Sequence, residues 1–182
     1  KTKDQIHRVC ISMITHPKAL EDTLFVTRRF KEETDLLISV LITPTLIHQQ
    51  DALEAIKRAG ADRVGIAIDA ATPEIFDQLR GRGVGGPHRW NTYWEVVEMA
   101  IAAFGRFNVG IHLIVGLGET EKEMVGTIQR GQEMGAYTHL FSFFPEKGSP
   151  MQDCSPPSLD QYRRIQLARW IINEGLGTAH QM

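Results

Sequence analysis

Five short apolar runs rich in β-branched residues recur along the chain at intervals of roughly thirty residues, the length of one βαβ unit. Each run is apolar at nearly every position instead of alternating with polar residues. This pattern predicts parallel strands whose two faces are both covered. The runs span residues 6–13, 36–42, 63–68, 108–115 and 137–143.

Signals for the beginning and end of helices lie between these runs. Pro17 and Thr72-Pro73 suit the first turn of a helix, and Gly60, Gly105 and Gly135 suit helix ends. The spacing of a capping box, in which a hydroxyl is followed three residues later by Glu or Gln, occurs at Thr92 with Glu95, Thr120 with Glu123, and Ser158 with Gln161.

The alternation of strands and helices predicts an α/β fold with a parallel sheet. The first strand-to-helix turn, Thr15-His16-Pro17, lacks the Gly-x-Gly-x-x-Gly pattern of an open dinucleotide-binding sheet. Regular spacing therefore favours one partial TIM-type (βα) barrel domain over residues 1–182. In such a fold the functional loops follow the carboxyl ends of the strands, here residues 14–16, 43–45, 69–72, 116–119 and 145–150.

Composition excludes several classes of protein. The chain is 42% hydrophobic and 23% charged with a net charge of -2, so no polycationic surface for nucleic acid is expected. The longest apolar run, residues 36–42, is too short to cross a membrane. Two cysteines and no secretion signal indicate a cytoplasmic protein. Because the chain begins at Lys1 without an initiator Met, we expect it to be truncated at its N-terminus.

The most informative segment runs from His112 to Thr120, where a buried strand leads into two glycines and a capped helix. Gly116 and Gly118 allow a tight turn and a close approach to a ligand. Bare amides at the start of the helix would favour an anionic group. The alternative is a tight loop that binds nothing.

Two other segments could contact a ligand. Asp69 ends the third run, where its carboxylate could accept hydrogen bonds from sugar hydroxyls or could cap the next helix. The loop from Arg80 to Arg89 has four glycines and three arginines, which could close over an anion or form a solvated connection. Residues 146–150 could present main-chain groups to the same end of the barrel.

Nucleophilic or metal chemistry has little support in the sequence. Cys10 lies within the first run, where a free cysteine is usually a small core residue, and Cys154 has no nearby base. The seven histidines form no metal-binding pattern, and two cysteines cannot supply a three-cysteine cluster, so no metal site is expected in this chain.

Four motifs in register resemble the second to sixth strands of the radical S-adenosylmethionine (SAM) superfamily, in its biotin synthase-like and lipoyl synthase-like group. Arg8-Val-Cys10 with Pro17 resembles the second strand, and Asp62, Asp69 and Pro73-Glu74 resemble the fourth. The run from Ile114 to Thr120 matches the fifth-strand signature Gly-x-Ile-x-Gly-x-x-Glu except at its first position. The stretch Lys147-Gly148-Ser149-Pro150 resembles the Lys-Gly-Thr-Pro after the sixth strand.

The resemblance implies a partial barrel that binds SAM across its strand ends. Asp69 would contact the ribose, Arg89 the SAM carboxylate, and Ile114 with Gly116, Gly118 and Glu119 the adenine and methionine side, with Lys147 and Gly148 nearby. In this family a 4Fe–4S cluster held by Cys-x3-Cys-x2-Cys cleaves SAM to a 5′-deoxyadenosyl radical that abstracts hydrogen. The family also implies a ferredoxin or flavodoxin as electron donor and a small-molecule or carrier-bound substrate.

Departures from the family pattern refine these expectations. The three cluster cysteines are missing, so the cluster is expected only in the full-length protein and the chain alone is expected to be inactive. His112 replaces the first glycine of the signature and, with Ser39, is expected to line the substrate pocket. In biotin synthase, cysteines on several strands help to hold an auxiliary cluster, and Ser39 and Gly110 occupy the approximate places of two of these cysteines. Their replacement favours other cofactor biosynthesis or maturation chemistry over sulfur insertion.

Two alternatives remain open. The chain could be a SAM-binding accessory subunit without a cluster of its own. It could also be an ordinary (βα) barrel lyase or aldolase, although its lysines Lys57, Lys122 and Lys147 lie in predicted helices or loops, away from strand positions suited to a Schiff base.

Overall fold

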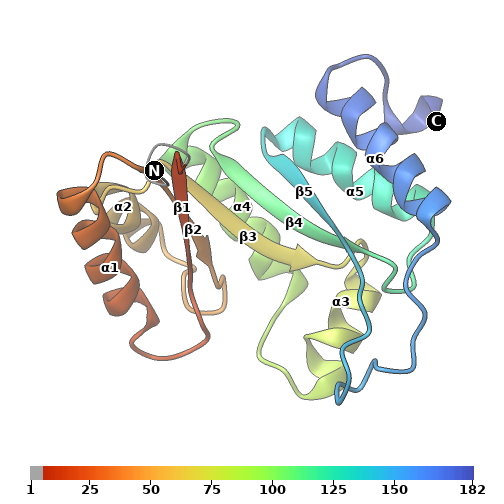
Figure 1. Ribbon diagram of the computed structural model, residues 1–182, viewed down its shortest axis with the longest axis horizontal. Helices are drawn as coiled ribbons and strands as arrows, with labels where there is room; N and C mark the ends of the chain where they lie inside the picture. The colour runs from red at the N-terminus through yellow and green to blue at the C-terminus, as the bar shows by residue number, and fades with distance from the viewer. Residues whose placement is uncertain (1–5) are drawn as a thin grey trace.

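Five parallel strands form one sheet in chain order, and the sheet curves into a partial barrel (Figure 1). The computed structural model describes residues 6–182, so the first five residues of the expected 1–182 domain lie outside the described part. Four strands lie inside the runs that predicted them, and the third extends one residue further. The strands are β1 (Arg8–Ser12), β2 (Leu37–Ile42), β3 (Arg63–Asp69), β4 (Val109–Val115) and β5 (Tyr137–Ser142).

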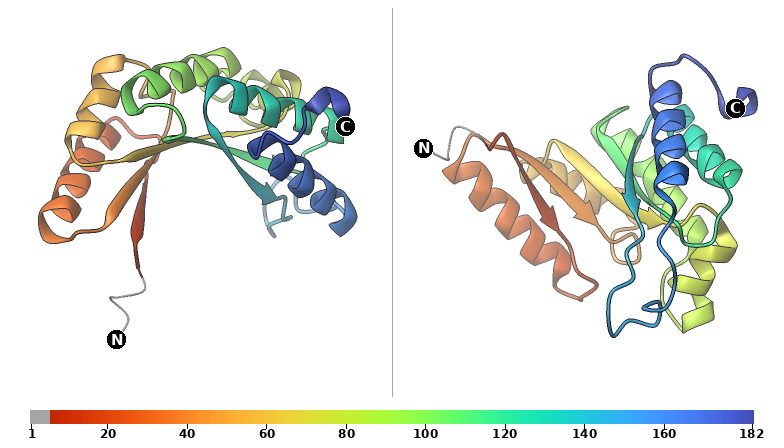
Figure 2. Two further views of the ribbon diagram at one scale, coloured as in Figure 1. Left: turned by 90° about the horizontal axis from the view of Figure 1, so that it is seen from above. Right: turned by 45° about the vertical axis from the view of Figure 1, so that its right-hand side comes forward.

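Helices connect the strands and cover only the convex side of the sheet (Figure 2). Six are α-helices: α1 (Ala19–Glu33), α2 (Gln50–Arg58), α3 (Pro73–Leu79), α4 (Trp90–Phe104), α5 (Glu121–Met134) and α6 (Leu159–Asn173). Two short 3-10 helices are η2 (Arg82–Val84) and η3 (Ala179–Gln181). Across residues 6–182, none of these helices combines the length and the apolar character needed to cross a bilayer.

Most of the predicted helix ends are confirmed. The Thr120 hydroxyl accepts from the Glu123 amide, and the Glu123 carboxylate accepts from the Thr120 amide, which completes the capping box of α5. Thr72 and Ser158 cap α3 and α6 with their hydroxyls. The cap expected at Thr92 is wrong, because α4 already begins at Trp90 and Thr92 lies within its first turn.

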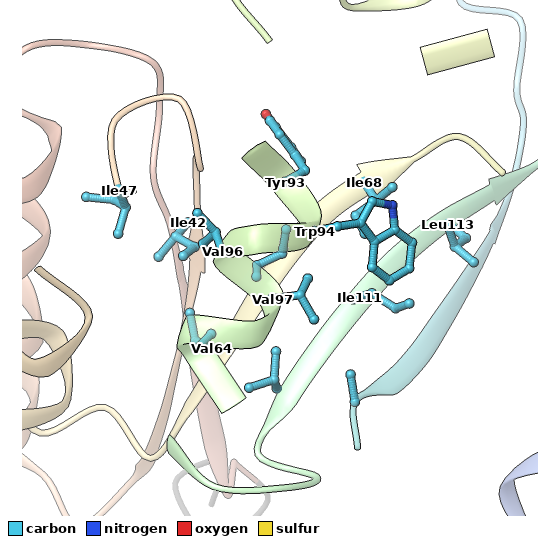
Figure 3. Close-up of a cluster of buried hydrophobic side chains, with 14 of the residues drawn as sticks. Ile42, Ile47, Val64, Ile68, Tyr93, Trp94, Val96, Val97, Ile111 and Leu113 are labelled. Carbon is cyan, nitrogen blue, oxygen red and sulfur yellow. The ribbon is translucent and has the colours of Figure 1, made fainter. Parts of the chain in front are cut away.

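The expectation that both faces of the strands are covered is also wrong. Side chains on the convex face are buried, whereas their neighbours on the concave face remain partly exposed, so burial alternates along β2 and β3. Figure 3 shows the buried layer, in which Val96 and Val97 of α4 pack toward Val64 of β3 and Ile111 of β4. The sheet curves without helices on its inner side, which explains the alternation.

This division separates stability from function. Ile38, Ile66 and Ile111 are completely buried on the convex face, and each such side chain stabilises the fold by about 1.5–3 kcal/mol. The side chains on the concave face contribute little to this buried core. They are therefore available, together with the loops at the carboxyl ends of the strands, to contact a ligand.

Candidate active site

A cavity of about 310 Å³ lies at the carboxyl ends of β3, β4 and β5. Asp69 and Arg80 provide its charged groups, and most of the remaining wall is apolar, including Ile114, Leu117, Phe143 and Met151. Its volume lies at the lower end of the range of small-molecule sites. A larger depression of about 620 Å³ lies between the residues before β1 and the turn that joins α1 to β2.

Asp69 is held in an uncommon backbone conformation at the end of β3. Its φ angle is 65°, and the pairing of β3 with β4 shifts register between Ala67 and Asp69. The carboxylate Oδ2 accepts a hydrogen bond from Arg80 Nη1 at 2.5 Å. Burial raises the pKa of Asp69, while the Arg80 charge opposes that rise. The alternative role of Asp69 as a helix cap is not observed, because Thr72 caps α3.

Arg80 is a cavity residue that sequence reasoning placed in the glycine loop but did not single out. Its guanidinium also donates to the Ala67 carbonyl oxygen and, at 3.2 Å, to the Tyr93 hydroxyl. It lies over the Phe76 and Tyr93 rings, with 5.6 and 5.2 Å to their centroids. Nothing in the sequence distinguishes Arg80 from the other arginines of the same loop.

Arg89, the residue expected to bind the SAM carboxylate, lies elsewhere. Its Nη1 donates to the carbonyl oxygens of Gly86 and His88, and its side chain does not line the cavity. His88 instead joins the loop to the site, because its Nδ1 lies 2.7 Å from the Thr45 hydroxyl and 2.8 Å from the Tyr93 hydroxyl. A series of linked polar side chains therefore runs from Thr45 through His88, Tyr93 and Arg80 to Asp69.

In the glycine loop after β4, the Glu119 carboxylate binds backbone amides of the same loop. Glu119 is buried, and its two oxygens accept from the amides of Gly116 at 2.8 Å and Leu117 at 2.9 Å. These two amides of the turn are therefore occupied. At the start of α5, where bare amides were expected, the Thr120 amide donates to the Glu123 carboxylate and the Glu123 amide donates to the Thr120 hydroxyl, so these two amides are not bare either. Gly116 and Gly118 both have positive φ, and only Leu117 of this turn lines the cavity. Glu119 therefore acts on the loop and not directly on the cavity.

The segment after β5 reaches the cavity through a residue that was not expected. Neither Lys147 nor Gly148 lines it, and the Gly148 amide donates to Gln152 Oε1 at 2.9 Å. Met151, three residues after Gly148, contributes an apolar side chain to the wall. The turn closed by the Gly148–Gln152 hydrogen bond thus positions Met151.

Ser39 and His112, the expected substrate residues, lie together on the concave face. Both line a second cavity of about 190 Å³, which Cys10 and Gly110 also line. Cys10 is exposed there, so its expected core position is wrong: β1 turns this residue away from the helices. The Ser39 hydroxyl accepts from Arg8 Nη1 at 2.9 Å.

No three histidine, cysteine or carboxylate side chains within residues 6–182 are grouped so that they could hold a metal ion. Cys10 lies on β1 and Cys154 in the loop before α6, and both are free and exposed. The described residues therefore do not fit a 4Fe–4S cluster.

Several known proteins are similar to this chain. A GTP 3′,8-cyclase from Microcystis aeruginosa (strain NIES-843 / IAM M-2473) is 26% identical over 124 residues, which cover 67% of this chain and 36% of the cyclase. A GTP 3′,8-cyclase from Picosynechococcus sp. (strain ATCC 27264 / PCC 7002 / PR-6) is 31% identical over 72 residues, 39% of this chain and 21% of that protein.

Two solved structures share the fold. The methylornithine synthase PylB has a TM-score of 0.69 at 16% identity, covering 90% of this chain and 48% of PylB. HydG, a maturase of the FeFe-hydrogenase, has a TM-score of 0.73 at 11% identity, covering 92% of this chain and 39% of HydG. The chain spans less than half the length of each of these four relatives. The model of the Radical SAM superfamily matches residues 1–131, more than half of the sequence, and the chain therefore belongs to this superfamily.

Proposed function

We propose that this chain forms the SAM-binding part of the barrel in a radical SAM enzyme, with the cofactor in the cavity at the carboxyl ends of β3 to β5. One observation carries the proposal. The Asp69 carboxylate and the apolar side chains of Ile114 and Leu117 converge in that cavity, which matches the polar ribose and the flat apolar base of an adenosyl group.

In this proposal Asp69 accepts hydrogen bonds from the ribose hydroxyls, and Arg80 holds its carboxylate in place. Ile114 and Leu117 cover the adenine, while Phe143 and Met151 exclude water. In this family bound SAM supplies the radical that abstracts hydrogen from the substrate. Direct SAM contacts by Arg89, Gly116, Gly118, Glu119, Lys147 and Gly148 stay predictions.

The cluster belongs outside residues 6–182 in this proposal, either in the same polypeptide or on a partner. A SAM-binding accessory subunit is the second candidate, favoured by the lack of a three-cysteine set among the described residues. For the whole protein we propose cofactor biosynthesis or maturation in the biotin synthase-like group. It would act in the cytoplasm on a small or carrier-bound substrate, with ferredoxin or flavodoxin as reductant.

Asp69→Asn is expected to weaken SAM binding by about tenfold or more, because hydrogen bonds to a charged group contribute about 1.5–3 kcal/mol. The measurement is calorimetric titration of the chain with SAM. Asp51→Asn, in the first turn of α2, is the matched control and should leave the affinity unchanged. Equal SAM affinity of the wild type and Asp69→Asn would contradict the proposal and favour an ordinary barrel lyase.

Arg80→Met is expected to lower the free energy of unfolding by about 2 kcal/mol, because it leaves a partly buried carboxylate without its cation. The pKa of Asp69 should rise further, so SAM binding should fall at a higher pH than in the wild type as the solution is acidified. Urea unfolding and SAM titration across pH measure both effects. Arg82→Met, in the same loop, is the control, and identical behaviour of the two variants would disprove the role of Arg80.

A further inference from the structure

The concave face of the sheet carries a second, polar cavity that the proposed SAM site does not use. It measures about 190 Å³ and shares no lining residue with the cavity around Asp69. All five strands contribute to it. Its polar groups come from Arg8 and Cys10 on β1, Ser39 on β2, Arg63 on β3, Asn108 just before β4, His112 on β4, and Tyr137 and His139 on β5.

A pair of glycines makes room for the two histidines. Gly65 of β3 and Gly110 of β4 are register partners and line the cavity. A Cβ atom on Gly110 would lie 2.8 Å from His139 Nε2, and one on Gly65 would lie 3.4 Å from His112 Nε2. The two imidazoles therefore lie over backbone that carries no side chain, with their ring centroids 5.3 Å apart.

Both imidazoles have a lowered pKa, which favours their neutral form. Burial and the neighbouring His139 lower the pKa of His112 to about 4. Partial burial and the charges of Arg169 and Arg63 lower the pKa of His139. A neutral imidazole has one N–H donor, and within the described part of the chain neither ring has a hydrogen-bond partner. The pair thus supplies donors without adding charge.

Two arginines that line this cavity differ in whether a carboxylate of residues 6–182 pairs with them. Arg8 is neutralised by Asp62, whose carboxylate accepts two hydrogen bonds from it at 2.5 and 2.9 Å. Arg63 is exposed and has no carboxylate partner among residues 6–182. Because the Ser39 hydroxyl accepts from Arg8, its own proton remains available for donation.

We propose that this cavity binds an oxyanion of the substrate, a carboxylate or a phosphate monoester. Arg63 supplies the charge, and Ser39, His112 and His139 supply hydrogen-bond donors. An oxyanion matches a wall that holds several donors and an arginine with no carboxylate partner among residues 6–182, because a charge-assisted hydrogen bond is stronger than a neutral one. The inference deepens the proposed function by naming the class of substrate, one with an anionic oxygen group, that the concave face of the sheet would bind. Only the identification of the anion as part of the substrate rests on that function.

The test uses the whole chain and proton NMR of the histidine rings at about pH 7.5. Inorganic phosphate and acetate are titrated separately, with chloride at equal ionic strength as the reference. Phosphate, acetate or both should shift the His112 and His139 signals saturably, and the tighter anion identifies the group. Arg63→Gln should weaken binding about tenfold and Ser39→Ala about threefold. Arg58→Gln, on α2 at the convex side, should leave it unchanged.

Two results would overturn the inference: no saturable shift with either anion, or equal affinity in the wild type, Arg63→Gln and Ser39→Ala. Since Arg63 is exposed, its replacement should leave the fold intact, and dispersed amide signals would verify this. Calorimetry with SAM on the same samples separates the two proposals. Anion binding without SAM binding removes only the proposed function, and SAM binding without anion binding removes only this inference.

Discussion

Gly116→Ala is expected to lower the free energy of unfolding by about 3 kcal/mol. Gly116 has a φ of 101°, a backbone conformation that costs an L-residue about 1–2 kcal/mol. A Cβ atom there would also lie 2.6 Å from Pro157 Cδ, and relieving such overpacking costs typically about 1–3 kcal/mol. Urea unfolding followed by circular dichroism measures the change.

Gly118→Ala is the matched control for this prediction. Gly118 has a φ of 113°, but a Cβ atom there meets nothing within 4 Å. Its replacement should therefore cost only the backbone term of about 1–2 kcal/mol. If both variants lose the same stability, the contact with Pro157 does not constrain the loop. The Gly116 variant should also bind SAM more weakly, because the turn positions Leu117 in the cavity.

Acidification from about pH 7.5 to pH 5 is expected to remove about 2 kcal/mol of stability through His112 alone. The folded-state pKa of about 4 lies below the ordinary value of 6.5. This depressed pKa contributes stability that is complete above pH 6.5 and is lost progressively down to about pH 4, because the unfolded chain binds the proton more readily. Over the whole window the loss is about 3 kcal/mol.

The measurement compares urea unfolding of the wild type and His112→Gln at both pH values. The variant should lose about 2 kcal/mol less on acidification than the wild type. Asp69 acts in the opposite direction, since its raised pKa favours the folded state as the carboxyl becomes protonated, so only the difference between the proteins isolates His112. His180→Gln, in η3, is the control. Equal pH dependence of the wild type and His112→Gln would refute the shift.

The secondary structure could be predicted from sequence because its signals are local. Apolar runs marked the five strands, and Thr72, Thr120 and Ser158 marked helix starts through caps that involve only neighbouring residues. The failed cap at Thr92 has a local reason too, since α4 begins two residues earlier without a side-chain cap. Covered strands could not be distinguished from half-exposed ones, because small or apolar residues such as Ala67 and Ile114 also occupy the concave face.

The candidate site could be predicted only in outline. Asp69 and Ile114 meet because both lie at carboxyl ends of adjacent parallel strands, which follows from topology. The choice of Arg80 over Arg89 as the partner of Asp69 depends on where α3 ends and where the glycine loop turns. Likewise, the sequence suggested bare amides at the start of the helix after the glycine loop, whereas Glu123 accepts from the Thr120 amide and Glu119 accepts from the Gly116 and Leu117 amides.

By itself, the sequence determined the order and type of the elements, their parallel arrangement and the edge of the sheet where the cavity around Asp69 lies. These follow from periodicity, short connections and the chirality of βαβ units, all of which act within one or two elements. Only the tertiary structure decided that the concave face stays open, that Arg80 pairs with Asp69 and that no carboxylate in the described part of the chain pairs with Arg63. Such pairings depend on side-chain directions across residues distant in the chain, which local patterns do not encode.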